Sequence, residues 1–294
     1  MRRVVYAIFL GSAPAVIGTV LLTALLLFIA VGPFIFGYDP NAVDASSRLL
    51  APSTAHPFGT DEVGRDIFTR LAVGGWPSLA TAMTIVAVSA GVGLVVGSVA
   101  GYLGGVLETV VKRVADGIQA FPTILAAVLI TYALRPGMVS IAIALSFCFW
   151  PYYAKIARGL ALPLRRAGYV ESALVQGSSS LRIVVRHIVP TGAPAILTQA
   201  TIALSEIVIF VGGLSFLGLG VREPTAEWGA MIAGSKDYVF SAPWYGLFPG
   251  LIIVATGIAF NLLGDSMREH FEGSASGLDE AAATIPSLPV KEAQ

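Results

Sequence analysis

The residues that could do chemistry in this chain lie at three places. His56, Asp61 and Asp66 lie close together in the sequence, and an imidazole with a carboxylate could act as an acid–base pair. Glu206 lies alone within a long apolar run. The third place, which we call the 169–190 segment, carries acidic, basic and hydroxyl side chains between two apolar runs. Such a polar segment between membrane spans is a candidate docking site for a soluble partner.

None of these places has the full set of groups that a catalytic or metal site requires. Cys148 is the one cysteine, so no internal disulfide is possible, and His56, His187 and His270 are far apart. No Gly-x4-Gly-Lys-Ser/Thr sequence is present, so a phosphate-binding loop of that kind is excluded. We predict no catalytic residue, no metal site and no cofactor bound by this chain.

The composition predicts that most of the chain lies in lipid. Hydrophobic residues make up 55% and charged residues 12% of the 294 residues, and the mean hydropathy is +0.79. The formal net charge is +0, which gives no reason to expect a nucleic-acid partner. We therefore predict an all-α polytopic membrane protein.

Six segments are long and apolar enough to span a bilayer, which takes ~20 residues. They are 13–36, 78–102, 120–134, 138–157, 195–219 and 245–263. The third is the shortest. Before the second, residues 61–71 are expected to form a short amphipathic helix at the membrane surface, with Ile67, Phe68 and Leu71 on its apolar face. We interpret the charges of that helix as structural rather than catalytic.

The distribution of lysine and arginine predicts the orientation. With the N-terminus in the cytoplasm, twelve of the 18 lie inside. The resulting organisation is a cytoplasmic N-terminus at 1–12, a membrane domain at 13–272 and a flexible cytoplasmic tail at 273–294. The membrane domain has outer loops at 37–76 and 220–244 and a cytoplasmic loop at 158–192.

The 169–190 segment is predicted to form two short helices. Gly177 can adopt a positive φ and end the first helix, and Ser178, Ser179 and Ser180 can cap the second. In the second helix the helical spacing predicts one apolar face, and Pro190 is expected to end the segment. That face comprises Leu181, Val184, Val185 and Ile188, with Arg182 and Arg186 pointing away.

The spacing of Glu171, Ala173 and Gly177, followed by Pro190, resembles the EAA loop of ABC importer permeases. The chain departs from that pattern at Ser172 and at His187. The resemblance implies that the loop docks on a cytoplasmic ATPase. The residues that it implicates in coupling are Tyr169, Val170, Glu171, Ser172, Ala173, Leu174, Gly177 and Pro190.

Further motifs in the same order resemble the C-type, second permease subunit of the dipeptide/oligopeptide/nickel family. They are His56-Pro-Phe-Gly-Thr-Asp61, Gly101-Tyr-Leu-Gly-Gly105, Leu214-Ser-Phe-Leu-Gly-Leu-Gly220, Glu227-Trp-Gly-Ala230, Phe248-Pro-Gly250 and Asn261-Leu-Leu-Gly-Asp265. The resemblance implies a six-helix fold of the type I importer kind in a bacterial-type cell membrane. It also implies a B-type permease partner, one or two ATPase subunits that bind ATP and magnesium, and an extracytoplasmic binding protein. The expected substrates are di- or oligopeptides, with nickel or another small solute as the alternative.

Glu206 permits two interpretations. A carboxylate in mid-span costs ~2.5–3.5 kcal/mol or more, so such residues face a cavity or pair with a polar group. Glu206 therefore either lines the translocation path, where it could meet a peptide's amino group, or is a structural acid. A similar choice holds for Gly93, Gly97 and Gly101, whose spacing allows close helix packing within the chain or with a partner subunit.

Two other functional classes remain as alternatives. A stand-alone secondary transporter would need ion or proton sites at mid-membrane and internal repeats, and Glu206 is the one deep candidate. A polytopic membrane enzyme would have to use His56, Asp61 and Asp66.

Overall fold

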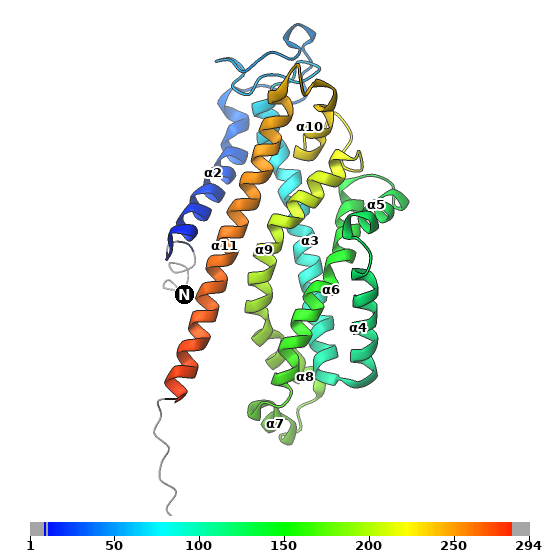
Figure 1. Ribbon diagram of the computed structural model, residues 1–294, viewed down its shortest axis with the longest axis vertical. Helices are drawn as coiled ribbons and strands as arrows, with labels where there is room; N and C mark the ends of the chain where they lie inside the picture. Colours follow the sequence, from blue (N-terminus) through cyan, green and yellow to red (C-terminus); the bar gives the residue numbers. More distant parts are fainter. Residues whose placement is uncertain (1–8, 10, 284–294) are drawn as a thin grey trace, which may run out of the picture.

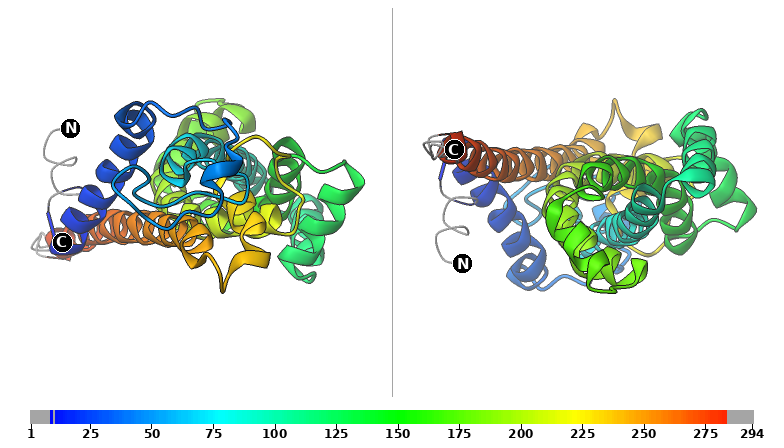
Figure 2. Two further views of the ribbon diagram at one scale, coloured as in Figure 1. Left: turned by 90° about the horizontal axis from the view of Figure 1, so that it is seen from above. Right: turned by 90° about the horizontal axis from the view of Figure 1, so that it is seen from below.

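The computed structural model describes residue 9 and residues 11–283, which form an elongated bundle of helices (Figure 1). Its long helices are α2 (Ala13–Ile35), α3 (Ile67–Leu103), α6 (Met138–Leu164), α9 (Val189–Phe216) and α11 (Pro243–Ala283). Viewed along the bundle, α3, α6 and α9 lie at the centre, with α2 and α11 on one side (Figure 2). The described part contains no β-strand, which confirms the predicted all-α class.

Five helices of the described part are long and apolar enough to cross a membrane. A sixth crossing is formed if α4 (Gly105–Gln119) and α5 (Thr123–Ala133), which meet at 90°, are counted as one span. The third span expected at 120–134 is thus only the second half of a bent pair. The break follows from Pro122, because a proline disfavours helical geometry at the residue before it, Phe121.

The start of the second span differs from the prediction. The short surface helix expected at 61–71 does not form, because residues 61–66 are a loop and α3 begins directly at Ile67. Asp66 caps α3 by accepting hydrogen bonds from the backbone nitrogen and the hydroxyl of Thr69, both at 2.7 Å. Four charged side chains of this region, those of Asp61, Arg65, Asp66 and Arg70, are buried rather than facing water.

The glycines Gly93, Gly97 and Gly101 of α3 pack within the chain rather than against a partner subunit. A Cβ built on Gly97 would lie 2.8 Å from the Cβ of Ala157, and one on Gly101 would lie 2.8 Å from the Cβ of Ala161. A Cβ on Gly93 would be closer still to the Cβ of Tyr153. These three glycines therefore seat α3 against α6 within the chain, as small residues do at close helix crossings.

The short elements mark the two ends of the bundle (Figure 1). One end carries α7 (Gly168–Val175) and α8 (Ser180–Ile183), and we call it the α7 end. The other end carries η1 (Ala45–Ser47), α10 (Trp228–Gly234) and η3 (Lys236–Tyr238), and we call it the α10 end. The predicted tail at 273–294 falls on the last residues of α11 and on residues 284–294, which lie outside the described part.

Candidate functional site

The first helix of the 169–190 segment ends as the sequence predicts. Gly177 has a φ of +80° and donates a backbone hydrogen bond to Leu174 at 2.9 Å. The next nitrogen, that of Ser178, donates to the carbonyl of Ala173 at 3.0 Å. This pair of bonds is the Schellman motif, in which a glycine in left-handed geometry closes a helix. Gly177 thereby turns the chain from α7 into α8.

A small hydrophobic cluster fixes the segment to the bundle. Val170, fully buried, packs with Ile183, Val184 and Ile188 of the same segment. The cluster includes Tyr102 from the end of α3 and Ala161 from the end of α6. Because this cluster is separate from the main core, α7 is held at the tips of α3 and α6 rather than being part of the bundle.

The remaining side chains of α7 are directed into solvent. Tyr169, Leu174 and Val175 have exposed fractions of 46%, 47% and 89%, and Ala173 is half-buried. Glu171 is exposed, and Ser172 uses its hydroxyl to donate to the carbonyl of Gly168 at 2.7 Å. Leu181 and Val185 of the same segment are further exposed apolar side chains, by 71% and 61%. We call these five apolar side chains the α7 surface: Tyr169, Leu174, Val175, Leu181 and Val185.

The exposure of Leu181 and Val185 corrects the predicted apolar face of the second helix. Only Val184 and Ile188 of that predicted set are buried, and Ile183 takes the third buried place. The cause is η2 (Val184–Ile188), a π-helix in which the amide of Val189 donates to the carbonyl of Val184. A π-turn holds more residues than an α-turn, so the 3.6-residue spacing used for the prediction does not apply there.

Pro190 does not end the segment, contrary to the sequence interpretation. It is exposed and lies in the first turn of α9, which continues α8 and η2 without a break from Ser180 to Phe216. A proline lacks the amide that an α-helix would pair with the carbonyl four residues earlier. The π-turn just before Pro190 accommodates the missing hydrogen bond, so the helix continues past Pro190. His187, one of the two departures from the family pattern, lies against Tyr169 with ring centroids 5.9 Å apart.

Glu206 lines a polar recess of about 410 Å³, where α4 gives way to α5 beside α6 and α9. Gln119, Thr123, Tyr152 and Ser205 contribute the other polar groups. Tyr152 donates to the amide oxygen of Gln199 at 2.9 Å. The recess also includes Cys148, Phe149, Ile202 and Ala203. Sequence reasoning identified Glu206 but none of its polar neighbours, because they come from four different elements.

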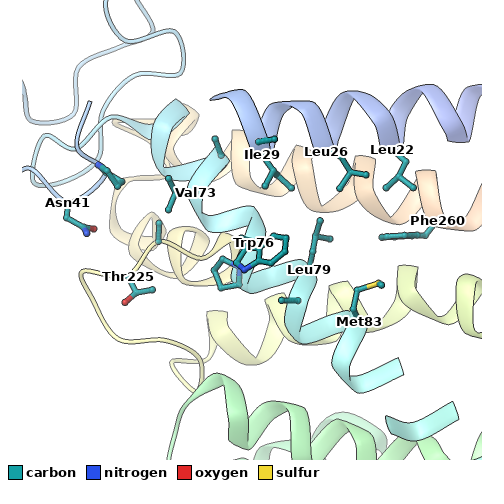
Figure 3. Close-up of a pocket in the computed structure, with 16 residues that line it drawn as sticks. Leu22, Leu26, Ile29, Asn41, Val73, Trp76, Leu79, Met83, Thr225 and Phe260 are labelled. Atoms are coloured by element: carbon teal, nitrogen blue, oxygen red, sulfur yellow. The ribbon is translucent and has the colours of Figure 1, made fainter. Parts of the chain in front are cut away.

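A larger cavity of about 1130 Å³ lies between α2 and α3 and contrasts with the recess (Figure 3). Leu22, Leu26 and Ile29 of α2 face Trp76 and Met83 of α3 across it (Figure 3). Its polar lining side chains are Asn41 and Thr225, both from loops at the α10 end. A cavity of this composition lacks polar partners for a peptide backbone along most of its length.

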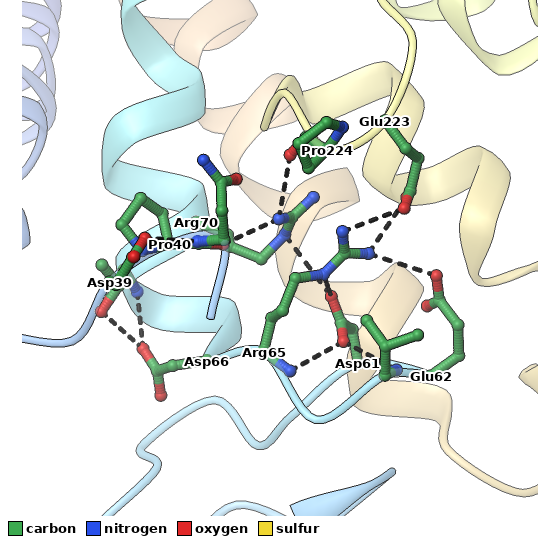
Figure 4. A network of polar contacts seen from close by, with 12 residues as sticks. Asp39, Pro40, Asp61, Glu62, Arg65, Asp66, Arg70, Glu223 and Pro224 are labelled. Carbon is green, nitrogen blue, oxygen red and sulfur yellow. Dashed lines mark hydrogen bonds and ion pairs between the residues drawn. The ribbon is translucent and has the colours of Figure 1, made fainter. Parts of the chain in front are cut away.

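At the α10 end a buried ion network joins the loop before α3 to the loop before α10 (Figure 4). The guanidinium of Arg65 is bonded to Asp61 at 2.6 Å and to Glu223 at 2.9 Å and 3.0 Å. Asp61 also accepts from the backbone of Arg65 at 2.9 Å. Arg70 donates to the carbonyl of Pro40 at 2.8 Å and lies 3.5 Å from Asp61.

This network has the character of a structural clamp. Burial alone would lower the pKa of Arg65, but its bonds to Glu223 and Asp61 raise that pKa above the ordinary value. The bond from Arg65 likewise lowers the pKa of Glu223, against the opposing effect of burial. Arg65 and Glu223 are therefore both charged, and each is bonded to the other. His56 and Asp66 meet at 2.9 Å, and Asp66 also caps α3, so neither carboxylate of the candidate acid–base cluster is available as a base.

The comparisons with known proteins agree with this arrangement. Residues 93–276 match the family described as binding-protein-dependent transport system inner membrane component. The chain is 36% identical to the probable D,D-dipeptide transport system permease protein DdpC of Escherichia coli K12, over 91% of this chain and 90% of that protein. It is 37% identical to the nickel transport system permease protein NikC of the same strain, over 90% and 96%. It is 34% identical to the dipeptide transport system permease protein DppC of Alkalihalophilus pseudofirmus, over 88% and 85%.

These matches cover nearly the whole chain and confirm the resemblance stated from the sequence motifs. The chain belongs to the family of binding-protein-dependent transport system inner membrane components, as a membrane permease of the ABC importer type.

Proposed function

We propose that this permease forms a path for di- or oligopeptides across the bacterial inner membrane, together with a B-type permease. In this proposal an extracytoplasmic binding protein delivers the peptide, and one or two cytoplasmic ATPases supply energy by binding and hydrolysing ATP with magnesium. The single observation that carries the proposal is the α7 surface, a set of exposed apolar side chains on a polar segment that a separate buried cluster anchors outside the main core.

The α7 surface fits a role in docking. An apolar patch on a soluble-facing segment is usually an interaction site, and here Glu171 and Arg182 border it with exposed charges. The residues proposed for coupling divide into two kinds. Val170 and Gly177 hold α7 in place, whereas Tyr169, Leu174 and Glu171 would contact the ATPase.

The distribution of positive charge supports a cytoplasmic position for the α7 end. Arg158, Arg165, Arg166, Arg182 and Arg186 all lie in or beside the loop that carries α7. Such an excess marks cytoplasmic loops. In this proposal the α7 end is cytoplasmic, both termini are cytoplasmic as the charge distribution predicts, and the Arg65 network faces the outside, where the binding protein arrives.

A movement of the ATPases would be transmitted from α7 to the translocation path through one helix. From Ile183, in the cluster that anchors α7, to Glu206 the chain is helical throughout, a distance of about 35 Å at ~1.5 Å per residue. A displacement of α7 therefore moves the wall of the recess that contains Glu206. This lever would switch the path between inward- and outward-facing states.

A peptide substrate is preferred to nickel on two grounds. DdpC and DppC are named as dipeptide permeases, and the recess offers one carboxylate without a histidine. Among the described residues, no group of three or more His, Cys, Asp or Glu side chains is placed to hold a metal ion. Nickel remains the alternative because NikC is equally similar and a chelated metal could be carried without direct ligands.

The proposal is tested by solubilising the chain from its native membrane and identifying the proteins that accompany it. We expect a second permease and one or two ATPases, and we expect Gly177→Arg to lose the ATPases while keeping the second permease. Gly37→Arg is the matched control, because Gly37 has a φ of +65° and the same empty surroundings as Gly177 but lies at the α10 end. Recovery of the chain alone, or ATPase binding by Gly177→Arg, would refute the proposal.

A further inference from the structure

The recess around Glu206 lies at mid-membrane depth. Glu206 is ten residues before the end of α9 at Phe216, or about 15 Å along the helix at ~1.5 Å per residue. That distance is about half of the ~30 Å hydrocarbon core. Tyr152, on α6, and Gln119, at the end of α4, reach the same level because all line the one recess.

The surface at this level divides into a polar and an apolar part. Glu206, Tyr152 and Gln119 are all exposed on the surface of the single chain. Large apolar side chains are exposed at other places along the spans, for example Leu129, Ile143 and Val254. A carboxylate and an amide at this depth do not face lipid, because charged side chains in spans face a bundle interior or a water-filled cavity. The recess therefore opens toward the partner permease, and so onto the path.

The carboxylate of Glu206 has no salt bridge or hydrogen bond to another side chain among the contacts of the described residues. The nearby cation Lys155 is engaged by Asp116 at 2.8 Å and by Gln119. The hydroxyl of Tyr152 donates to Gln199 instead. Ser205 donates to the carbonyl of Ile202 at 2.6 Å, so its oxygen can still accept.

We infer that this recess is a subsite for a positively charged amino group of the transported molecule, with Glu206 as its counter-ion. The inference rests on the proposed function and gives the path its chemical selectivity. An ammonium group donates three hydrogen bonds. Glu206, Ser205 and the hydroxyl of Thr123 supply oxygen acceptors, and the rings of Tyr152 and Phe149 offer faces that attract cations. The volume of about 410 Å³ lies within the range of sites for small ligands.

A primary amine suits this set of groups better than a bare metal ion does. Nickel and zinc prefer imidazole or several anionic ligands, and the recess has one carboxylate, one thiol and neutral oxygens. A peptide's α-amino group matches the single negative charge. The side-chain amine of a lysine within a peptide has the same chemistry, and the experiment below separates the two.

The test uses the complete importer in proteoliposomes, with both permeases, the ATPases and the binding protein. The probe is radiolabelled alanyl-alanine, and the readout is peptide taken up per ATP hydrolysed. We expect Glu206→Gln to lower this ratio about tenfold, the effect of losing one charge-assisted bond, while basal ATP hydrolysis persists. Glu206→Asp is expected to keep most of the activity. Asp237→Asn, which removes an exposed carboxylate at the α10 end, is expected to change nothing.

The outcomes separate this inference from the proposed function. Absence of ATP-dependent uptake by the unaltered importer would refute the proposed function itself. Normal uptake with a ratio within twofold of the unaltered value in Glu206→Gln would refute only the subsite. A parallel loss of uptake and ATP hydrolysis would also refute the subsite, since Glu206 would then be structural. Equal losses for alanyl-alanine and alanyl-lysine in Glu206→Gln would identify the α-amino group, which both peptides carry, as the group bound, whereas a larger loss for alanyl-lysine would show that the side-chain amine also binds.

A second measurement detects the charge without relying on the binding protein. Thr123→Cys in a Cys148→Ala background places one thiol beside Glu206. We expect a cationic methanethiosulfonate reagent to label it several-fold faster than an anionic one, and Glu206→Gln to remove that preference. Equal rates before the Glu206 change, or no labelling by either reagent, would overturn the inference.

Discussion

Arg65 and Glu223 are 158 positions apart in the chain, yet two hydrogen bonds of 2.9 Å and 3.0 Å join their side chains. Arg65 is 2% exposed and is also bonded to Asp61, which is fully buried. The pair therefore fixes the loop before α10 to the start of α3. Since a buried charge is tolerated only with its partner, this contact fixes how the α10 end is folded.

Arg65→Ala is expected to destabilise the permease strongly. The change leaves Asp61 buried without its main cation, which costs ~3–5 kcal/mol for a buried pair. Thermal unfolding of the purified chain in detergent measures the loss. Arg48→Ala is the control, since Arg48 contacts Tyr238 at the surface of the same end. Equal melting temperatures for the two variants would contradict the structural role of Arg65.

Glu223 predicts how stability depends on pH. Its pKa in the folded chain is lowered by Arg65, so its contribution is present above the pKa of the unfolded chain, ~4.3, and is lost as pH falls through the lower folded value. Glu223→Gln should therefore be less sensitive to acid than the unaltered chain below about pH 4.3. Melting temperatures between neutral pH and pH 3 check this, and parallel curves would count against it. The effect is expected to be small because Glu223 is 62% exposed.

Val175 and Val170 should respond in opposite ways to the same substitution. Val175 is 89% exposed, so Val175→Glu is expected to leave the melting temperature unchanged but to prevent ATPase recruitment. Val170 is fully buried, so Val170→Glu is expected to unfold the segment, at a cost of several kcal/mol for an unpaired buried charge. Co-purification and thermal unfolding of each variant provide the measurements. Full ATPase recruitment by Val175→Glu would exclude the α7 surface as the docking site.

Gly97 and Gly91 form a matched pair on α3. Gly97→Leu would force a side chain into Ala154 and Ala157 of α6, and overpacking of this kind costs ~1–3 kcal/mol or more. A Cβ on Gly91 meets nothing within 4 Å, so Gly91→Leu is expected to be tolerated in the folded chain. The yield of folded protein and its melting temperature distinguish the two. Similar behaviour of both variants would mean that α3 and α6 pack less closely than described.

Features set by local chemistry could be predicted from the sequence. Gly177 ends α7 because few other residues adopt its φ, and that preference belongs to the residue itself. The apolar runs predicted five of the six spans, because the minimum length of a span follows from bilayer thickness. The motifs around Glu171 and along the chain identified the family correctly.

Features that depend on distant partners could not be predicted. Arg65 and Arg70 resemble part of the polar face of a surface helix, because their partners Glu223 and Pro224 are far away in sequence. Leu181 was assigned to the buried face because periodicity assumes α-helical geometry and cannot detect a π-turn. The polar neighbours of Glu206 could not be predicted either, because Gln119 and Tyr152 are distant in sequence and come close to Glu206 only in the folded chain.

The continuous helix from Ser180 to Phe216 also relates the time at which α7 moves to the time at which access at Glu206 changes. This helix contains the π-turn of η2, Pro190 and Pro194, positions at which helices bend, so it moves as one rod when it keeps a single shape through the ATPase cycle. ATP-driven displacement of α7 and the change of access at Glu206 would then be a single kinetic event. Fluorescent reporters on α7 and beside Glu206 should give traces that superimpose, with no lag between the displacement of α7 by the ATPases and the change of access at Glu206.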